Sequence, residues 1–222
     1  MDITNIPLAD LKDFFTYFQI ITAVAGSLCY YKYKDTYLKY FLFLLWYIVF
    51  NDIFAKLYRI NVSNYDFLFN NSSQIISFSL YFLLFKSAVK NKKNKIIITT
   101  LSIIYYCFLM ICLFNENFFT EYFSNTFIVG GTLIIISILI YLFEILQTDK
   151  IIQINKMLIF WISLGLLFFL LPNIPFNVIR NYYKDSLTIP YIYTVYFLLL
   201  FIYNVILITG FISSSKSQRD YV

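Results

Sequence analysis

The chain has 222 residues, of which 60% are apolar and 13% are charged, with a formal net charge of +5. A soluble domain of this size needs more polar surface to stay dissolved, so the composition excludes an ordinary soluble protein and predicts an integral membrane protein. The chain has no histidine, and its three cysteines lie inside apolar runs. We therefore expect no cofactor, no metal site and no disulfide framework, and the sequence favours a protein that is not an enzyme.

Seven apolar runs are long enough to cross a hydrocarbon core of about 30 Å, which takes about 20 helical residues. They lie at 14–33, 38–58, 67–87, 96–114, 123–146, 157–178 and 189–212. We therefore predict an all-α, polytopic bundle of seven transmembrane helices, one domain over residues 1–212, followed by a short cytoplasmic tail over 213–222. The first residues, Met1-Asp2-Ile3, are acidic where a secretory signal is basic, so we expect the first helix to stay in the mature protein.

Basic residues are distributed unevenly between the connections. The first, third and fifth connections and the C-terminal segment hold twelve Lys and Arg residues, and the other side holds five. Because cytoplasmic loops retain Lys and Arg, this bias predicts an N-terminus outside and a C-terminus in the cytoplasm, in the cell's inner (plasma) membrane. The run from Lys90 to Lys95 then faces anionic lipid of the bilayer's inner leaflet, and we expect this anchoring role rather than nucleic-acid binding.

Polar side chains concentrate in the outer third of the predicted bundle. The third span carries a stripe at helical spacing from Asn70 to Tyr81, and the sixth ends in a segment where Pro172 and Pro175 free backbone carbonyls. One hypothesis is an outward-facing pocket for a small polar or cationic ligand, lined by Asp52, Asn70, Gln74, Asn173, Tyr193 and Tyr196. The alternative needs no ligand: an ion pair of Asp52 with Lys56, tyrosines in an interfacial belt, and amides that bond between helices.

Glu144 lies near the cytoplasmic end of the fifth span. At 1.5 Å per residue it stands roughly 20 Å or more from Asp52 in depth, so the two carboxylates form no catalytic pair. We expect either an ion pair with a nearby lysine (Lys86, Lys150 or Lys156) or a role in coupling to a cytoplasmic partner. Gly130 and Gly131, in the same span, predict a face of close helix contact.

Two known seven-helix families do not fit. Microbial rhodopsins need a retinal lysine in the last helix, and residues 191–212 contain none; sweet-type sugar transporters repeat a proline motif that occurs once here. The stretch from Asn155 to Gly165, together with Tyr141 to Glu144, resembles small uncharacterised seven-helix membrane proteins of bacteria. That resemblance implies a sensor-like membrane module that works with a separate signalling protein.

Three functions follow as hypotheses from these patterns. The first is a receptor or sensor that binds a small ligand from outside and signals through a separate cytoplasmic or membrane partner, because polarity is concentrated at one depth. The second is a small-solute transporter, because the polar stripe continues inward to Tyr81. The third is an intramembrane lipid-processing enzyme that uses Asp52 with tyrosines.

Overall fold

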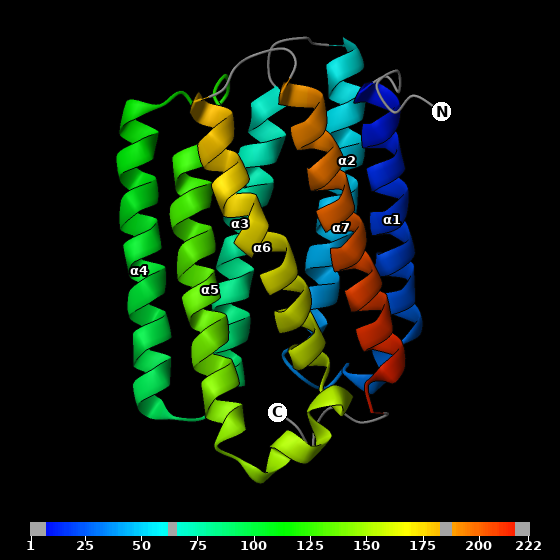
Figure 1. Ribbon diagram of the computed structural model, residues 1–222, viewed down its shortest axis with the longest axis vertical. Helices are drawn as coiled ribbons and strands as arrows, with labels where there is room; N and C mark the ends of the chain where they lie inside the picture. Colours follow the sequence, from blue (N-terminus) through cyan, green and yellow to red (C-terminus); the bar gives the residue numbers. More distant parts are fainter. Residues whose placement is uncertain (1–7, 62–65, 183–187, 216–222) are drawn as a thin grey trace.

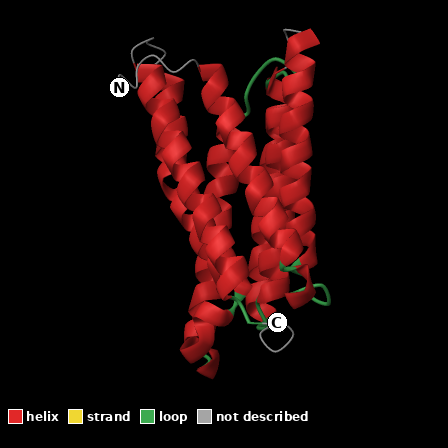
Figure 2. Cartoon of the chain, turned by 90° about the vertical axis from the view of Figure 1, so that its right-hand side faces the viewer, coloured by secondary structure: helices red, strands yellow, loops and turns green. Residues whose placement is uncertain are grey.

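The computed structural model describes residues 8–61, 66–182 and 188–215, and all regular structure in these ranges is helical. The long helices are α1 (Leu8–Leu28), α2 (Lys39–Asn61), α3 (Asp66–Ala88), α4 (Lys92–Asn115), α5 (Ser124–Leu146), α6 (Leu158–Tyr182) and α7 (Thr188–Ser213). Two short 3-10 helices are η2 (Tyr30–Lys32) and η3 (Asp149–Lys156). The long helices lie side by side along one axis (Figure 1, Figure 2). We call the end where α1, α3, α5 and α7 begin the upper end, and the opposite end the lower end.

The helices form a ring with one addition on its outside. Each long helix packs against the next one along the chain, and α7 packs against α1, while α3 also packs against α5. Helices α1, α2, α3, α5, α6 and α7 therefore close a ring, and α4 lies in the groove between α3 and α5 at the edge of the bundle (Figure 1). Figure 1 also shows η3 crossing beneath the lower end.

The protein is a multi-pass membrane protein. Five helical segments are long and apolar enough to cross a bilayer, and they lie at Lys39–Leu57, Lys92–Asn115, Ser124–Leu146, Leu158–Ile179 and Thr194–Ser213. A shorter apolar segment, Thr16–Leu28, belongs to α1. Large apolar side chains such as Phe43, Phe114 and Ile212 are exposed on the outside of the bundle. Such faces are stable against lipid acyl chains but not against water.

The observed helices follow the predicted apolar runs except at the first one. That run was predicted to stay helical to residue 33, but α1 ends at Leu28 and η2 follows. The apolar sequence continues because Tyr33 folds back into the core, where it is 1% exposed and its hydroxyl donates to the carbonyl of Gly26 at 2.6 Å. An apolar run therefore marks burial here rather than helix.

Glycine allows α5 to approach its neighbours closely, as predicted. A Cβ on Gly130 would lie 2.4 Å from the Phe78 ring of α3 and 2.7 Å from the Tyr105 ring of α4. A Cβ on Gly131 would lie 3.3 Å from Ile174 of α6. The glycine pair thus brings α3 and α4 onto one side of α5 and α6 onto the other.

Candidate functional site

The predicted ligand-binding residues differ in burial. Gln74 and Asn173 are buried, at 8% and 2% exposed, whereas Asp52 and Tyr196 are half-buried and Asn70 is exposed. The Tyr193 side chain lies outside the described residues. Of the polar stripe predicted along α3, Gln74, Ser77 and Tyr81 face the interior.

Four of the six predicted residues lie at a similar depth in the bundle, and Asn70 lies nearer the upper end. Counting from the helix ends, Asp52, Gln74, Asn173 and Tyr196 lie about 12–14 Å below the upper ends of their helices, at a rise of 1.5 Å per residue. They come from four helices, and the ring packing places α5 between α3 and α6. Tyr196 packs edge-on against Phe169 of α6, with ring centroids 5.8 Å apart.

Gln74 and Asn173 carry buried amide atoms that lack hydrogen-bond partners. Both side-chain atoms of Gln74, Oε1 and Nε2, are buried and unpartnered, and so is Nδ2 of Asn173. The other amide atom of Asn173, Oδ1, accepts from Nδ2 of Asn177 at 3.3 Å. Buried polar atoms in proteins are nearly always bonded, because an unmade hydrogen bond costs about 1–3 kcal/mol. These amides therefore have unused capacity for a polar partner.

The two amides lie on either side of the glycine pair in α5. Phe78, which meets Gly130, is one helical turn from Gln74 on α3, and Ile174, which meets Gly131, directly follows Asn173 on α6. Tyr105 also has a buried hydroxyl without a hydrogen-bond partner; the Thr126 hydroxyl lies close to the Cys112 thiol but outside hydrogen-bonding geometry. We call these four residues, Gln74, Tyr105, Thr126 and Asn173, the upper interior.

Asn71, three residues before Gln74 on α3, shows what a bonded amide looks like in the same helix. Asn71 is 0% exposed; its Nδ2 donates to the carbonyls of Phe118 and Glu121, and its Oδ1 accepts from the N–H of Phe123 at 3.1 Å. All of its partners belong to the α4–α5 connection and the residue before α5. Asn71 holds that connection in place, whereas Gln74 holds nothing that the structure shows.

Further down the bundle, polar side chains from different helices bond or lie close to one another. Thr22 of α1 donates to Oδ1 of Asn204 in α7 at 2.6 Å, and Nδ2 of Asn204 bonds the carbonyl of Leu200. The side chains of Tyr81 and Tyr203 come close enough to interact, although the Tyr203 hydroxyl lies outside hydrogen-bonding geometry.

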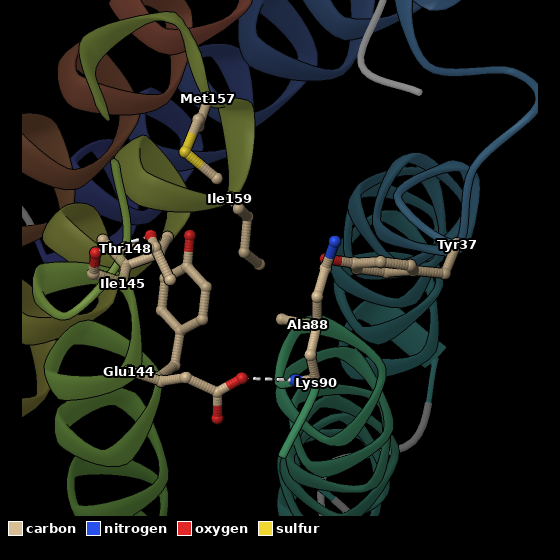
Figure 3. Close-up of a pocket in the computed structure, with 9 residues that line it drawn as sticks. Tyr37, Ala88, Lys90, Glu144, Ile145, Thr148, Met157 and Ile159 are labelled. Atoms are coloured by element: carbon tan, nitrogen blue, oxygen red, sulfur yellow. Dashed lines mark hydrogen bonds between the residues drawn. The ribbon is translucent and has the colours of Figure 1, made fainter. Parts of the chain in front are cut away.

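Glu144 binds backbone N–H groups, a kind of partner that the sequence analysis did not consider. Its Oε1 accepts from the N–H group of Lys90 (Figure 3) and from that of Asn91 at 3.0 Å. Its Oε2 accepts from Nδ2 of Asn94. Asn91 is the N-cap of α4. The carboxylate from α5 therefore compensates unpaired N–H groups at the start of α4, where a negative charge is favourable.

Lys32 has a similar role for α7, which the sequence did not indicate. It is 8% exposed, and its Nζ donates to the carbonyls of Phe211, Ile212 and Ser214 at 2.7, 2.9 and 3.0 Å. These carbonyls end α7 and have no partner within the helix. The ammonium group uses all three donors, and in this way the α1–α2 connection fixes the C-terminal end of α7.

A cavity of about 60 Å³ also lies at the lower end. Its polar lining consists of Tyr37, Lys90, Tyr141, Glu144 and Thr148, and Met157 and Ile159 form part of its apolar wall (Figure 3). The Tyr141 hydroxyl is buried there without a hydrogen-bond partner. Sequence reasoning missed this site because its residues come from four separate segments. The feature of the sequence that pointed nearest to it is Tyr141, one helical turn before Glu144.

No family model matches the chain, and neither a curated protein nor a solved structure is similar to it. Within the part of the chain that the structure describes, no three Cys, Asp or Glu residues come together in a way that could hold a metal ion. The assignment of a function therefore depends on the geometry of the upper interior and of the lower end.

Proposed function

We propose that the protein is a receptor-like membrane sensor that binds a small polar ligand between its helices and passes the signal to a separate partner. The observation that supports this proposal is the Gln74 side chain, buried with neither its donor nor its acceptor paired. A bound ligand that supplied partners would recover hydrogen bonds that the ligand-free protein lacks. Asp52 and Tyr196, at the same depth, would complete the site; Asn70 and Tyr193 belong to the proposal from the sequence pattern alone.

The unpartnered polar atoms of the upper interior favour a neutral ligand over a cationic one. Gln74 offers one acceptor and one donor, Asn173 offers a donor, and the hydroxyls of Tyr105 and Thr126 offer either. None of these four groups carries a charge, and Asp52, the charged residue of the proposed site, is half-buried and already has an interaction partner. We therefore propose a small, uncharged molecule that has both donors and acceptors, such as an amide or a polyol.

The proposal includes the topology predicted from the basic residues. In it, all seven helices cross the plasma membrane, the upper end faces outside and the lower end faces the cytoplasm. The site would then open outward, and the lower end, where Lys32 and Glu144 fix helix ends, would face the partner. In this arrangement Glu144 couples α5 to the α3–α4 connection. Reporter fusions after residue 222 test the orientation: a fusion that is active only outside the cell would contradict it.

A ligand screen tests the binding site. The full-length protein, purified in mild detergent, is exposed to small amides, polyols and sugars, and binders are identified as compounds that raise its Tm. We expect Gln74→Met to abolish the shift, because the thioether fills the same space without the amide. Thr132→Val is the matched control, since the Thr132 hydroxyl is exposed and bonds the Ile128 carbonyl. Equal shifts in both variants would refute the site.

A small-solute transporter is the second candidate, favoured by polar groups that continue below the upper interior. Tyr81 and Tyr203 interact midway, and the unpartnered hydroxyl of Tyr141 lies at the lower cavity. Uptake of the identified ligand into proteoliposomes, slowed in Tyr81→Phe without loss of binding, would establish transport. Binding without uptake, together with a protein partner that co-purifies in stoichiometric amount, would support the sensor.

A further inference from the structure

We propose that the cavity at the lower end binds a phosphate group, supplied either by a phospholipid headgroup or by free phosphate. This site is separate from the upper interior and does not depend on the function proposed above. Lys90 and Thr148 are exposed, so the cavity opens to the surface at the depth where the helices end.

The groups left unbonded around the cavity are hydrogen-bond donors. Both oxygens of Glu144 already accept N–H groups, and the Thr148 hydroxyl donates to the carbonyl of Ile145 at 2.8 Å. The hydroxyl of Tyr141, a residue that is 2% exposed, has no hydrogen-bond partner. Tyr37 brings a second hydroxyl to the lining of the same cavity. Both hydroxyls can donate to an occupant, and the Lys90 ammonium in the same lining can only donate, so an occupant that offers several acceptors satisfies all three.

Charge favours an anion at the same place. Residues 86–95 contain five lysines and no acidic residue. Of these lysines, Lys90 lines the cavity. Glu144 is the acidic residue in the lining; its charge is opposed by Lys90 in the same lining and by nearby Lys95, and its two oxygens are occupied by three N–H donors. Burial raises the pKa of Tyr37, so this hydroxyl keeps its proton and remains a donor.

The size of the cavity fits a phosphate group. Each water-sized atom needs about 10–15 Å³ of such space, so a cavity of about 60 Å³ accepts roughly four to six atoms. A phosphate group has one phosphorus and four oxygens. The apolar wall formed by Met157 and Ile159 would adjoin the first carbons of a lipid. An ammonium and two hydroxyls around one anion resemble known charge-assisted phosphate contacts.

The test uses full-length protein in mild detergent and counts bound lipids by native mass spectrometry. Two lipids are compared: phosphatidic acid, and diacylglycerol with the same acyl chains, which lacks the phosphate group. We expect phosphatidic acid to bind at least about tenfold more tightly, and Lys90→Gln and Tyr141→Phe each to weaken its binding by about tenfold, the loss typical of one charge-assisted hydrogen bond. Lys93→Gln is the control, since this exposed lysine lies in the same basic segment but does not line the cavity.

Inorganic phosphate distinguishes the two sources. If excess inorganic phosphate displaces phosphatidic acid and raises the Tm of the protein, free phosphate occupies the site; if phosphatidic acid resists displacement, the site takes a lipid headgroup. Tyr37→Phe replaces Tyr141→Phe if the latter does not give monodisperse protein. Equal binding of the two lipids, or an equal loss in Lys93→Gln and Lys90→Gln, would overturn the proposal in favour of general surface attraction.

Discussion

The lower end and the upper interior of the bundle differ in how they accommodate buried polar groups. At the lower end, Lys32 makes three hydrogen bonds to the end of α7, and Glu144 accepts three from the start of α4 and the residues before it. In the upper interior, both side-chain atoms of Gln74 and one of Asn173 make none. The bonded groups join segments far apart in the chain, whereas the unbonded ones lie between helices that glycine already holds together.

This difference separates a structural role for buried polarity from a binding role. A polar group that bonds helix ends contributes to stability and loses it when its partner is removed. A polar group without a partner costs stability in the ligand-free protein, and its removal recovers that cost. The sign of the change in the free energy of unfolding therefore assigns each residue to one role or the other.

The largest effect is expected at Lys32. Lys32→Met keeps the aliphatic stem but removes the donor to three carbonyls at the end of α7, of which that of Phe211 keeps only the bond from the Ser214 hydroxyl at 3.2 Å. We expect this change to lower the free energy of unfolding by about 3 kcal/mol. Denaturant unfolding in mixed micelles measures it. Lys34→Met, at an exposed lysine in the same connection, should change it by less than about 0.5 kcal/mol. Equal losses in the two variants would show that the contacts of Lys32 do not hold α7.

The next effect concerns the glycine pair between α3 and α6. Gly130→Ala would place its methyl group 2.4 Å from the Phe78 ring, and we expect it to cost about 2–3 kcal/mol because the packed rings must shift. Gly131→Ala meets the flexible end of Ile174 at 3.3 Å, so the gain in helix propensity should leave stability within about 1 kcal/mol of the parent. Thermal unfolding of both variants checks this; similar Tm values would contradict the close packing of α5 against α3.

The third prediction is that substitutions of two nearby amides, Gln74 and Asn71, change the free energy of unfolding in opposite directions. Gln74→Met removes two unpartnered polar atoms and should raise the free energy of unfolding of the ligand-free protein by about 1 kcal/mol. Asn71→Leu removes three hydrogen bonds to the α4–α5 connection and should lower it by about 2 kcal/mol. Unfolding in the same detergent compares them. A loss of stability in Gln74→Met would mean that this amide is bonded in the ligand-free protein, contrary to its proposed role.

The sequence could predict the helices and the depth of the polar residues because both are local properties. Apolar runs located α2 to α7, and helical spacing placed Gln74, Ser77 and Tyr81 on one inward face. It could not predict that Gln74 is unpartnered and Asn71 bonded. Both are amides near the upper end of α3, and their partners are decided by how α5 and the connection before it pack.

The contacts at the lower end were beyond sequence reasoning for a different reason. Lys32 counts as one more basic loop residue in the sequence, but it bonds Phe211, 179 positions away. Glu144 bonds the backbone N–H groups of Lys90 and Asn91, which the sequence does not mark as partners because every residue except proline has such a group. Charge patterns can propose ion pairs, but they do not reveal which backbone donors a fold leaves unpaired.

The smallest expected effect tests whether Glu144 and the start of α4 act as one unit. Glu144→Gln, Asn94→Ala and the double variant form a thermodynamic cycle for the bond between Oε2 and Nδ2 of Asn94. Because the carboxylate is partly exposed, we expect a coupling energy of about 0.5–1 kcal/mol, measured by unfolding in mixed micelles. The pair Glu116 and Asn125 at the upper end, joined at 3.3 Å and exposed, is the control and should couple by less than that. If the two cycles give the same value, Glu144 contributes no more than a surface contact, and α5 reaches the α3–α4 connection without holding it. A larger coupling at Glu144 would show that this contact holds α5, the helix that carries Gly130 and Gly131, to the start of the basic segment at the lower end.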